Sequence, residues 1–384
     1  MGERTTDSGG IFLSAGEASG DLHGSRLVKA LRELAPETRI TCLGGPALKE
    51  AGAEVLVDNR DLAVVGLFEV VRHLRVIASA LRRIENHLRK DRPRLVVLID
   101  FPDFNFLLAR LAARLGIRVF YYISPQIWAW RRGRVRTVRR FVHEMAVILP
   151  FEAEFYRQYG IHVHYVGHPL LDVMEAAPTV EAARERYRPS GPGPVVGILP
   201  GSRHGEIRLL LPTLLETAAQ LCERVPGVSF LVPVAPTLDA APLREAFDAK
   251  GLPAGVVTGD TYGAIRACDL LIAVSGTVTL EAAILGVPMI VVNRVSDLSY
   301  YTGRHLIKVT HVGLPNLIAG RGIVPELLQH DATPERIAAK ALEFLQDPGR
   351  LDEQRKDLAS IRNRLGTSGV ARRTAKLVLE TIPR

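Results

Sequence analysis

Short apolar runs alternate with longer segments of helical periodicity through most of the chain. In the first half, the apolar runs predict strands at residues 11–14, 39–43, 54–57, 95–100, 118–123, 145–149 and 163–166. The segments between them predict helices at residues 21–34, 69–89, 105–115, 131–141 and 152–159. A regular alternation of strands and helices indicates βαβ units and a parallel sheet, which binds ligands at the carboxyl ends of its strands.

The alternation starts again after residues 172–194, a segment rich in proline and glycine that is typical of an interdomain connection. Strands are predicted at residues 195–199, 230–234, 256–258, 270–274 and 289–293. Helices are predicted at residues 206–224, 243–250, 262–267, 277–285 and 334–345. The pattern predicts an α/β protein with two Rossmann-like domains facing a cleft, residues 1–172 and 173–350, and a charged helical tail, residues 351–384.

The length and composition agree with this organisation. A chain of 384 residues, 47% hydrophobic and 23% charged, suits two folded domains rather than a disordered segment. No apolar run approaches the roughly 20 residues that span a bilayer, and the N-terminus lacks the apolar core of a signal peptide. We therefore expect a cytoplasmic protein whose cysteines, Cys42, Cys222 and Cys268, are free thiols.

Each half begins with an apolar strand that breaks into a glycine-rich turn. The first turn is SAGEASGD at residues 14–21, and the second is LPGSRHGE at residues 199–206. Glycine lets the backbone approach a ligand closely, and the helix that follows offers unpaired N–H groups and a positive dipole end. Both turns therefore predict the binding of a charged ligand.

A third turn, SGTVTLE at residues 275–281, also joins an apolar strand to a helix. Its hydroxyls suit the phosphates of a nucleotide, and Glu281 is placed to accept two ribose hydroxyls. A capping box with Glu281 at the N3 position explains this segment alone equally well. The glycine turn in the same domain favours the nucleotide, and Arg203 in that turn suits a diphosphate.

Two carboxylates follow the apolar strand predicted at residues 95–100. Asp103 precedes a helix and is expected to act as its N-cap. Asp100, at the tip of the strand, has no such role, and it is the first candidate for a base that deprotonates an alcohol. Glu17, in the first glycine turn, is the second candidate.

Three histidines, His162, His164 and His168, alternate along one predicted strand. No cysteine or carboxylate set completes a zinc site with them, so core or surface positions are expected. The chain has no P-loop motif and no G-x-S-x-G serine elbow, which disfavours a P-loop ATPase and a serine hydrolase.

Lysine and arginine outnumber aspartate and glutamate by 49 to 41, which gives a net charge of +8. The basic residues gather at residues 72–94 and 131–140, the second group just after Trp128 and Trp130. Because an apolar segment at residues 62–68 precedes the first group, contact with an anionic bilayer is one interpretation, and a solvated helix face is the other. Single-stranded nucleic acid is disfavoured, because no nucleic-acid module accompanies these residues.

Five short blocks resemble, in the same order, the bacterial lipid-A-disaccharide synthases. They are SAGEASGD at 14–21, IDFPDFN at 99–105, SPQIWAW at 124–130, LPGSR at 199–203 and LPNL at 314–317. The resemblance implies an inverting, metal-independent GT-B glycosyltransferase without a cofactor, whose C-terminal helical tail, here residues 351–384, packs back on the N-terminal domain. Such an enzyme joins UDP-2,3-diacylglucosamine to 2,3-diacylglucosamine 1-phosphate, forming a β-1,6-linked disaccharide and UDP in lipid A biosynthesis.

The resemblance also implies roles for individual residues. Asp100 is the base with Glu17 nearby, and Arg203 is required at the diphosphate. The UDP side comprises Gly201, Ser202, Arg203, Ser275, Gly276, Thr277, Thr279, Glu281 and Asn316. The acceptor and membrane side comprises Gly16, Ser19, Asp103, Trp128, Trp130, Val65, Leu67 and Phe68.

Acylated substrates imply a protein that rests peripherally on the anionic cytoplasmic face of the inner membrane. The family includes homodimers that exchange C-terminal parts, so a dimer of this kind is an expectation here, and no nucleic-acid partner is expected. Two alternatives from other classes stay open. One is an isomerase that resembles the UDP-GlcNAc 2-epimerases, which share the two-Rossmann cleft. The other is a non-catalytic, membrane-associated nucleotide-binding protein, which the presence of Asp100, Glu17, Arg203 and Glu281 disfavours.

Overall fold

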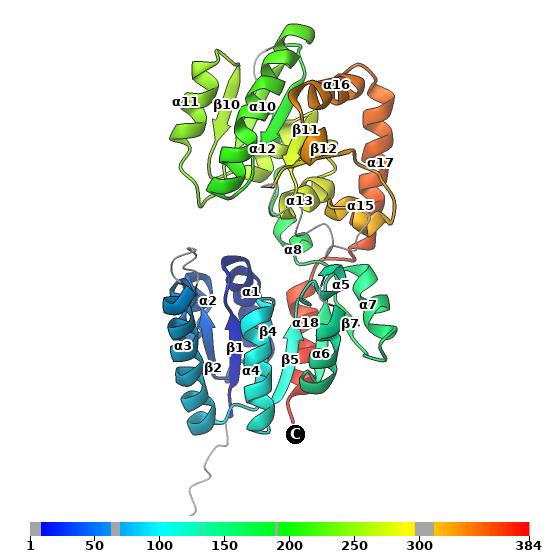
Figure 1. The fold of residues 1–384 in the computed structure, drawn as a ribbon. Coiled ribbons are helices and arrows are strands. Elements are labelled where there is room, and N and C mark those ends of the chain that lie inside the picture. The colour runs from blue at the N-terminus through cyan, green and yellow to red at the C-terminus, as the bar shows by residue number, and fades with distance from the viewer. Residues whose placement is uncertain (1–8, 63–69, 131, 189–190, 296–310, 384) are drawn as a thin grey trace, which may run out of the picture. The chain divides into compact units, whose positions relative to one another are not determined.

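A computed structural model describes residues 9–62, 70–130, 132–188, 191–295 and 311–383, with the backbone alone at residues 70–74 and Trp130. The chain forms two compact α/β units, each built around its own parallel sheet (Figure 1). Unit 1 comprises Met1–Asp172 and Gly366–Arg384, and unit 2 comprises Val173–Leu365. The predicted fold class, with a C-terminal helix that returns to the first unit, is confirmed.

Unit 1 contains a seven-stranded parallel sheet with the strand order β3-β2-β1-β4-β5-β6-β7. Its strands are β1 (Ile11–Ala15), β2 (Ile40–Gly44), β3 (Glu54–Asp58), β4 (Leu95–Ile99), β5 (Arg118–Tyr122), β6 (Glu144–Val147) and β7 (His164–Tyr165). Its helices are α1 (Ala18–Leu34), α2 (Pro46–Glu50), α3 (Val70–Asp91), α4 (Pro102–Arg114), α5 (Ile127–Trp130), α6 (Val135–Phe141), α7 (Pro150–Arg157) and α18 (Val370–Thr381), and α8 (Leu170–Met174) crosses the sequence boundary between the units.

The two faces of this sheet carry separate cores. The central strands β1 and β4 are buried along their whole length, because the sequences IFLSA and LVVLI are almost entirely apolar. Leu13 and Val97 pack in the core that contains α1 and α18, whereas Phe12 and Val96 pack in the core that contains α3 and α4. Adjacent residues of a strand point to opposite faces, so both faces need helices to cover them.

The C-terminal helix α18 packs beside α1 in unit 1. The Asp172 carboxylate accepts hydrogen bonds from the N–H groups of Gly369 (2.7 Å) and Val370 (3.2 Å), which satisfies the start of α18. The Arg373 guanidinium donates to the Val166 carbonyl at 3.0 and 2.9 Å. Capping and packing therefore fix the last helix to the first half of the chain.

Unit 2 contains a six-stranded parallel sheet with the strand order β10-β9-β8-β11-β12-β13. Its strands are β8 (Val195–Leu199), β9 (Ser229–Pro233), β10 (Ala254–Val257), β11 (Leu270–Val274), β12 (Met289–Asn293) and β13 (Glu326–Leu328). Its helices are α9 (Val180–Tyr187), α10 (His204–Arg224), α11 (Ala241–Ala249), α12 (Thr261–Ala267), α13 (Thr277–Leu285), α15 (Leu314–Ala319), α16 (Pro334–Leu345) and α17 (Pro348–Arg364).

The charged tail differs from its prediction. Residues 351–384 were expected to pack on the first domain, but α17 packs against α13, α15 and α16 in unit 2. Leu351, Leu358 and Ile361 are buried there, so α17 completes the core of unit 2 and only the segment from Gly366 returns to unit 1. Charged residues separate the apolar positions of α17, so its sequence does not show a clear apolar face.

Both sheets reverse their strand order at one point, between β1 and β4 in unit 1 and between β8 and β11 in unit 2. In open parallel sheets, ligands bind in the crevice that the carboxyl ends of the strands form at this switch point. The glycine turns after β1 and β8 lie at these two places, and so do the polar segments after β4 and β11.

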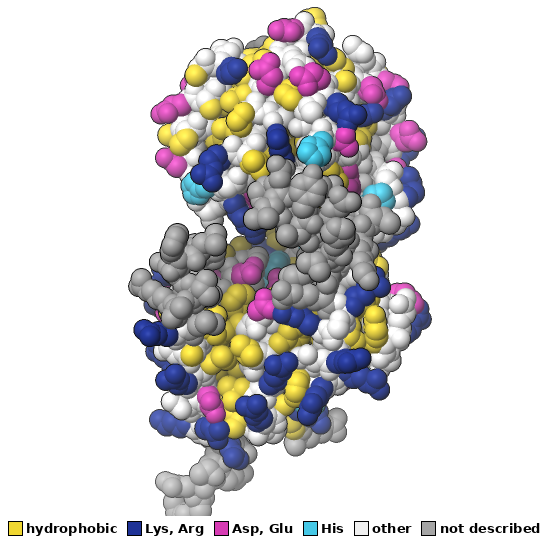
Figure 2. All heavy atoms as spheres, in the orientation of Figure 1, with side chains coloured by type: hydrophobic (Ala, Val, Ile, Leu, Met, Phe, Trp, Pro, Cys, Tyr) yellow, Lys and Arg dark blue, Asp and Glu magenta, His cyan; other side chains and the backbone are white. Residues whose placement is uncertain are grey.

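On the face shown in Figure 2, Lys and Arg side chains gather over α3, α4 and α6 of unit 1, with apolar side chains between them. Arg82, Arg83 and Arg89 on α3 and Arg136 and Arg139 on α6 are exposed. Within the described part of the chain, no helix has both the length and the apolar character to cross a membrane.

Candidate functional site

The switch point of unit 1 brings the first glycine turn close to the end of β4. Gly16 follows β1 and is buried, and an added Cβ there would lie 2.1 Å from Cδ1 of Phe101. Only glycine leaves room for the Phe101 ring at this distance. The segments after β1 and β4 are therefore packed directly against each other, as the sequence-based pairing of Gly16–Glu17 with Asp100 requires.

The backbone at Asp100 ends the strand abruptly. Asp100 and Phe101 have φ values of 43° and 47°, in the left-handed region that residues other than glycine rarely adopt. Two hydrogen bonds hold the Asp100 carbonyl, one from the Tyr121 hydroxyl and one from Nδ2 of Asn105, both 2.7 Å. Oδ1 of Asn105 accepts in turn from the Ser14 hydroxyl at 2.7 Å. Backbone strain supported by buried hydrogen bonds is characteristic of functional positions.

The Asp100 carboxyl has an environment suited to proton transfer. Burial, with a smaller effect from the negative charge of Glu17, raises its pKa to about 6, although the N–H of Phe101 opposes the shift. Asp100 is half-buried, whereas Glu17 is exposed at the N-cap of α1. A carboxylate with a pKa near the working pH is both ionised and basic enough to accept a proton.

Two other predicted residues, Ser19 and Asp103, lie in the first turns of the helices that follow β1 and β4. Ser19, in the first turn of α1, is exposed. Asp103 is exposed and pairs with Arg134, and its predicted role as N-cap is wrong, because Phe101 is the N-cap and Pro102 opens the helix. Asp103 is then at the second helical position, where its charge still interacts favourably with the helix dipole.

Among the other residues predicted on the acceptor and membrane side, the structure describes the side chain of Trp128. Trp128 is buried, and its indole N–H donates to Oε1 of Glu152 at 3.2 Å. The Glu152 carboxylate also accepts from the N–H of Leu149 at 3.0 Å, and burial raises its pKa to about 7. Trp128 therefore positions this segment from the interior. The predicted membrane-side residues Val65, Leu67 and Phe68 and the side chain of Trp130 lie outside the described residues.

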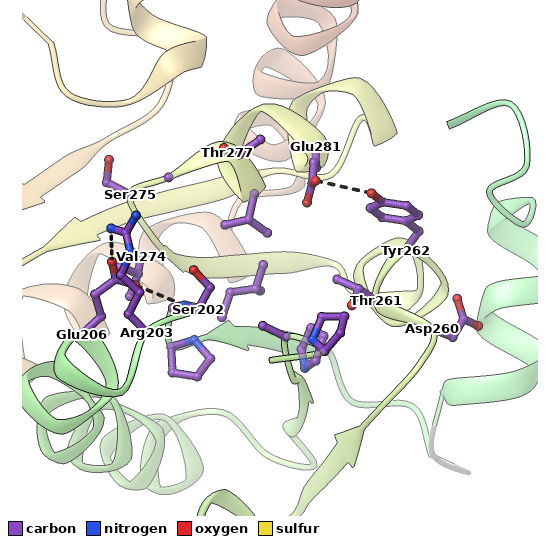
Figure 3. A pocket seen from close by; sticks show the side chains of 18 of the residues that line it. Ser202, Arg203, Glu206, Asp260, Thr261, Tyr262, Val274, Ser275, Thr277 and Glu281 are labelled. Atoms are coloured by element: carbon purple, nitrogen blue, oxygen red, sulfur yellow. Dashed lines mark hydrogen bonds and ion pairs between the residues drawn. The ribbon is translucent and has the colours of Figure 1, made fainter. Parts of the chain in front are cut away.

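Unit 2 contains a cavity of about 550 Å3 at its switch point (Figure 3). The turn between β8 and α10 lines it with the predicted residues Gly201, Ser202 and Arg203. The turn after β11 and the first part of α13 line it with the predicted residues Ser275, Gly276, Thr277 and Glu281. The volume, and its position above two helix N-termini, suit a nucleotide with its phosphates on the helix ends.

The loop from Gly201 to Arg203 is organised by Glu206, which the sequence analysis missed. Gly201 has φ 110°, a conformation that favours glycine. Oε2 of Glu206 accepts from the Ser202 N–H at 3.1 Å, and Oε1 lies 3.2 Å from Nη1 of Arg203 (Figure 3). The Arg203 side chain is 82% exposed, and its ion pair with Glu206 lies at the surface.

The start of α13 offers backbone donors rather than a side-chain cap. Gly276 is its N-cap and makes no side-chain capping bond. Glu281 is therefore at the fifth helical position, and the alternative of a capping box with Glu281 at N3 is wrong. Its carboxylate lies 3.4 Å from the Tyr262 hydroxyl, and burial raises its pKa, partly offset by this hydrogen bond (Figure 3).

Two predicted donor-side residues have internal partners instead. Thr279 is buried and donates its hydroxyl to the Gly276 carbonyl at 2.8 Å, which closes the turn beneath the cavity. Asn316 is buried on α15, where Nδ2 donates to Glu326 at 2.7 Å and Oδ1 accepts from the N–H of Ile323 at 2.7 Å. Neither residue lines the 550 Å3 cavity, so both support the fold around it.

Curated proteins with similar sequences match almost the whole chain. The lipid-A-disaccharide synthase of Syntrophus aciditrophicus is 47% identical over 374 residues, covering 97% of each chain. The synthase of Geobacter sulfurreducens is 45% identical over 372 residues, again 97% of each chain. The family model of lipid-A-disaccharide synthetase matches residues 11–381.

Solved structures with the same fold are more distant. The glycosyltransferase of kitacinnamycin has a TM-score of 0.65 at 19% identity, covering 98% of this chain and 99% of that one. The UDP-GlcNAc 2-epimerase of Neisseria meningitidis, bound to UDP-GlcNAc, has a TM-score of 0.65 at 13% identity, covering 96% and 99%. These likenesses show the GT-B fold, which epimerases share, whereas the full-length sequence matches are to synthases. The chain therefore belongs to the lipid-A-disaccharide synthetase family, glycosyltransferases of lipid A biosynthesis.

Proposed function

We propose that the chain condenses UDP-2,3-diacylglucosamine with 2,3-diacylglucosamine 1-phosphate, giving the β-1,6-linked disaccharide 1-phosphate and UDP. Family membership over residues 11–381 supports the reaction. The observation that carries the proposed mechanism is the Asp100 carboxyl, strained into place after β4 with a pKa raised to about 6.

Unit 2 is the proposed donor-binding unit. The diphosphate of UDP is bound by the free N–H groups at the start of α13 and by Arg203, which is always charged and has a fork of donors. Glu281, from the wall of the cavity, accepts the ribose hydroxyls. These positive groups of the protein also stabilise the negative charge that develops on the diphosphate as its bond to the sugar breaks.

Asp100 is the proposed base of the transfer. It accepts the proton of the acceptor 6-hydroxyl while that oxygen forms a bond to the anomeric carbon of the donor. The bond from this carbon to the diphosphate breaks on the opposite side, its electron pair leaves with UDP, and the configuration inverts. The mechanism requires the acceptor on unit 1 to meet the donor on unit 2 during turnover, with Glu17 keeping Asp100 basic.

The membrane is the proposed source of both lipid substrates. Exposed arginines of α3 and α6 attract anionic headgroups, and the apolar segment at residues 62–68 suits acyl chains. We place the protein on the cytoplasmic face of the inner membrane, peripherally bound, as a homodimer that exchanges C-terminal parts. Sedimentation with vesicles tests the membrane binding: the protein is expected to bind anionic but not zwitterionic vesicles, and equal binding to both contradicts the proposal.

The reaction is tested by incubating the protein with both lipid substrates and following products by mass spectrometry. Equal amounts of disaccharide 1-phosphate and UDP are expected, with none when either substrate is omitted. A parallel incubation with UDP-GlcNAc alone tests for epimerase activity. Formation of the 2-epimer without an acceptor, or no disaccharide with both substrates, contradicts the proposal.

A further inference from the structure

Strands β6 and β7, at one edge of the unit 1 sheet, bring together Glu144, His162 and His164. One oxygen or nitrogen atom from each residue lies within 4.8 Å of the others. Nε2 of His164 lies 2.9 Å from Oε2 of Glu144, and the two imidazole rings are 5.1 Å apart at 81°. The structure therefore places a carboxylate beside two of these histidines, which the sequence alone did not predict.

The fold explains why the cluster forms. His162 and His164 are two residues apart on an extended segment, so their side chains share one side of the chain. The parallel pairing of β6 with β7 places His164 opposite Ala146, two residues beyond Glu144 on the neighbouring strand. The pairing of the two strands therefore places the Glu144 carboxylate beside the histidines. Because Glu144 comes from a different strand, its distance from them along the sequence does not reveal the cluster.

The surroundings of the cluster are polar and open to solvent. A cavity of about 360 Å3 beside it is lined by Glu144 and His164, and also by Arg118, His143 and Glu380. The Arg118 guanidinium donates to the Thr381 carbonyl at 3.3 Å, while Nδ1 of His143 accepts from the N–H of Val119 at 3.1 Å.

Two imidazoles and one carboxylate form a ligand set that Zn²⁺ prefers. His162 is exposed and Glu144 and His164 are half-buried, so water has access to the remaining coordination positions. We propose that Glu144, His162 and His164 bind one Zn²⁺ or a chemically similar divalent transition-metal ion. The ion ties the two-residue strand β7 to β6 and plays no part in the transfer reaction.

The test uses the full-length protein without a histidine tag, which would itself bind the metal. Titration with ZnCl₂ by calorimetry is expected to give one site per chain, and Zn²⁺ but not Mg²⁺ is expected to raise the unfolding temperature. His162→Ala and His164→Ala should each weaken Zn²⁺ binding at least about tenfold. The control His330→Ala removes an exposed histidine of unit 2 and should leave binding unchanged.

Co²⁺ provides a second measurement, because visible absorption reports its coordination directly. The absorption is expected with wild-type protein and lost in His162→Ala, a variant that removes an exposed side chain and leaves the core intact. Absence of a stoichiometric site, or Zn²⁺ binding that survives in the His162→Ala/His164→Ala variant, overturns the proposal. Loss of binding in Cys222→Ser also overturns it, because the half-buried thiol would then be a ligand.

Discussion

The side-chain amide of Asn105 is bonded to the backbone of Asp100, with 2.7 Å between Nδ2 and the Asp100 carbonyl oxygen. The same Nδ2 donates to the Ile99 carbonyl at 3.1 Å, and Oδ1 accepts from Ser14 at 2.7 Å. One fully buried residue at the start of α4 therefore joins the ends of β1 and β4. Asn105 is a positioning residue, because it fixes the backbone that directs the Asp100 carboxyl.

Replacing Asn105 should damage both stability and turnover. Asn105→Ala leaves the buried Ser14 hydroxyl and two carbonyls without this partner, which should lower the free energy of unfolding by about 1–3 kcal/mol. The kcat of the folded fraction should also fall, with little change in donor KM. Tyr121→Phe, which removes only one bond to the Asp100 carbonyl, is the control and should have a smaller effect. Equal kcat in Asn105→Ala and wild type would contradict the positioning role.

Asp100→Asn removes the proposed base but keeps the size of the side chain. Turnover should fall by about 10²–10⁴-fold, the usual loss when a positioned base is removed. UDP affinity, measured by calorimetry, should not change, because the donor cavity is built entirely by unit 2. Near-normal turnover would remove Asp100 from the mechanism and make Glu17 the base.

The pH dependence of kcat/KM should report the Asp100 carboxyl. Its pKa is raised to about 6, so the rate should fall as the pH drops through about 6 and the base becomes protonated. The Glu17 charge contributes to this rise, and Glu17→Gln should therefore shift the acidic limb to lower pH. Glu33→Gln, an exposed change on α1, is the control. An acidic limb at the same pH in both variants would show that Glu17 does not act on the titrating group.

The fold was largely predictable, because parallel strands buried on both faces are continuous apolar runs such as 95–99 and 270–274. The prediction failed where burial does not depend on such a run. Strand β13 has only three residues, each partly buried, and α17 buries widely spaced positions of a charged helix. Neither gives a strong periodic signal, because the neighbouring elements rather than the local sequence decide their burial.

The candidate site was predictable where a turn lines the cavity with its own residues. Gly201, Ser202 and Arg203 line the cavity in unit 2 as expected. Asn316 was predicted at the same site but does not line this cavity, because its side chain is bonded to Glu326, a partner that the sequence does not reveal. Asn105 was missed for the same reason, because its partners come from β1 and β4.

Glu206 is expected to compete with the diphosphate of UDP for Arg203. Glu206 accepts from the Ser202 N–H and pairs with Arg203, the residue that we propose binds the diphosphate. Arg203→Ala should weaken UDP binding about 10–100-fold, the loss of a charged hydrogen bond of about 1.5–3 kcal/mol. Glu206→Gln should instead tighten UDP binding, by no more than about fivefold, because the pair is exposed. Calorimetry with UDP distinguishes these outcomes, and weaker binding in Glu206→Gln would show that the carboxylate shapes the loop for the diphosphate rather than competing with it.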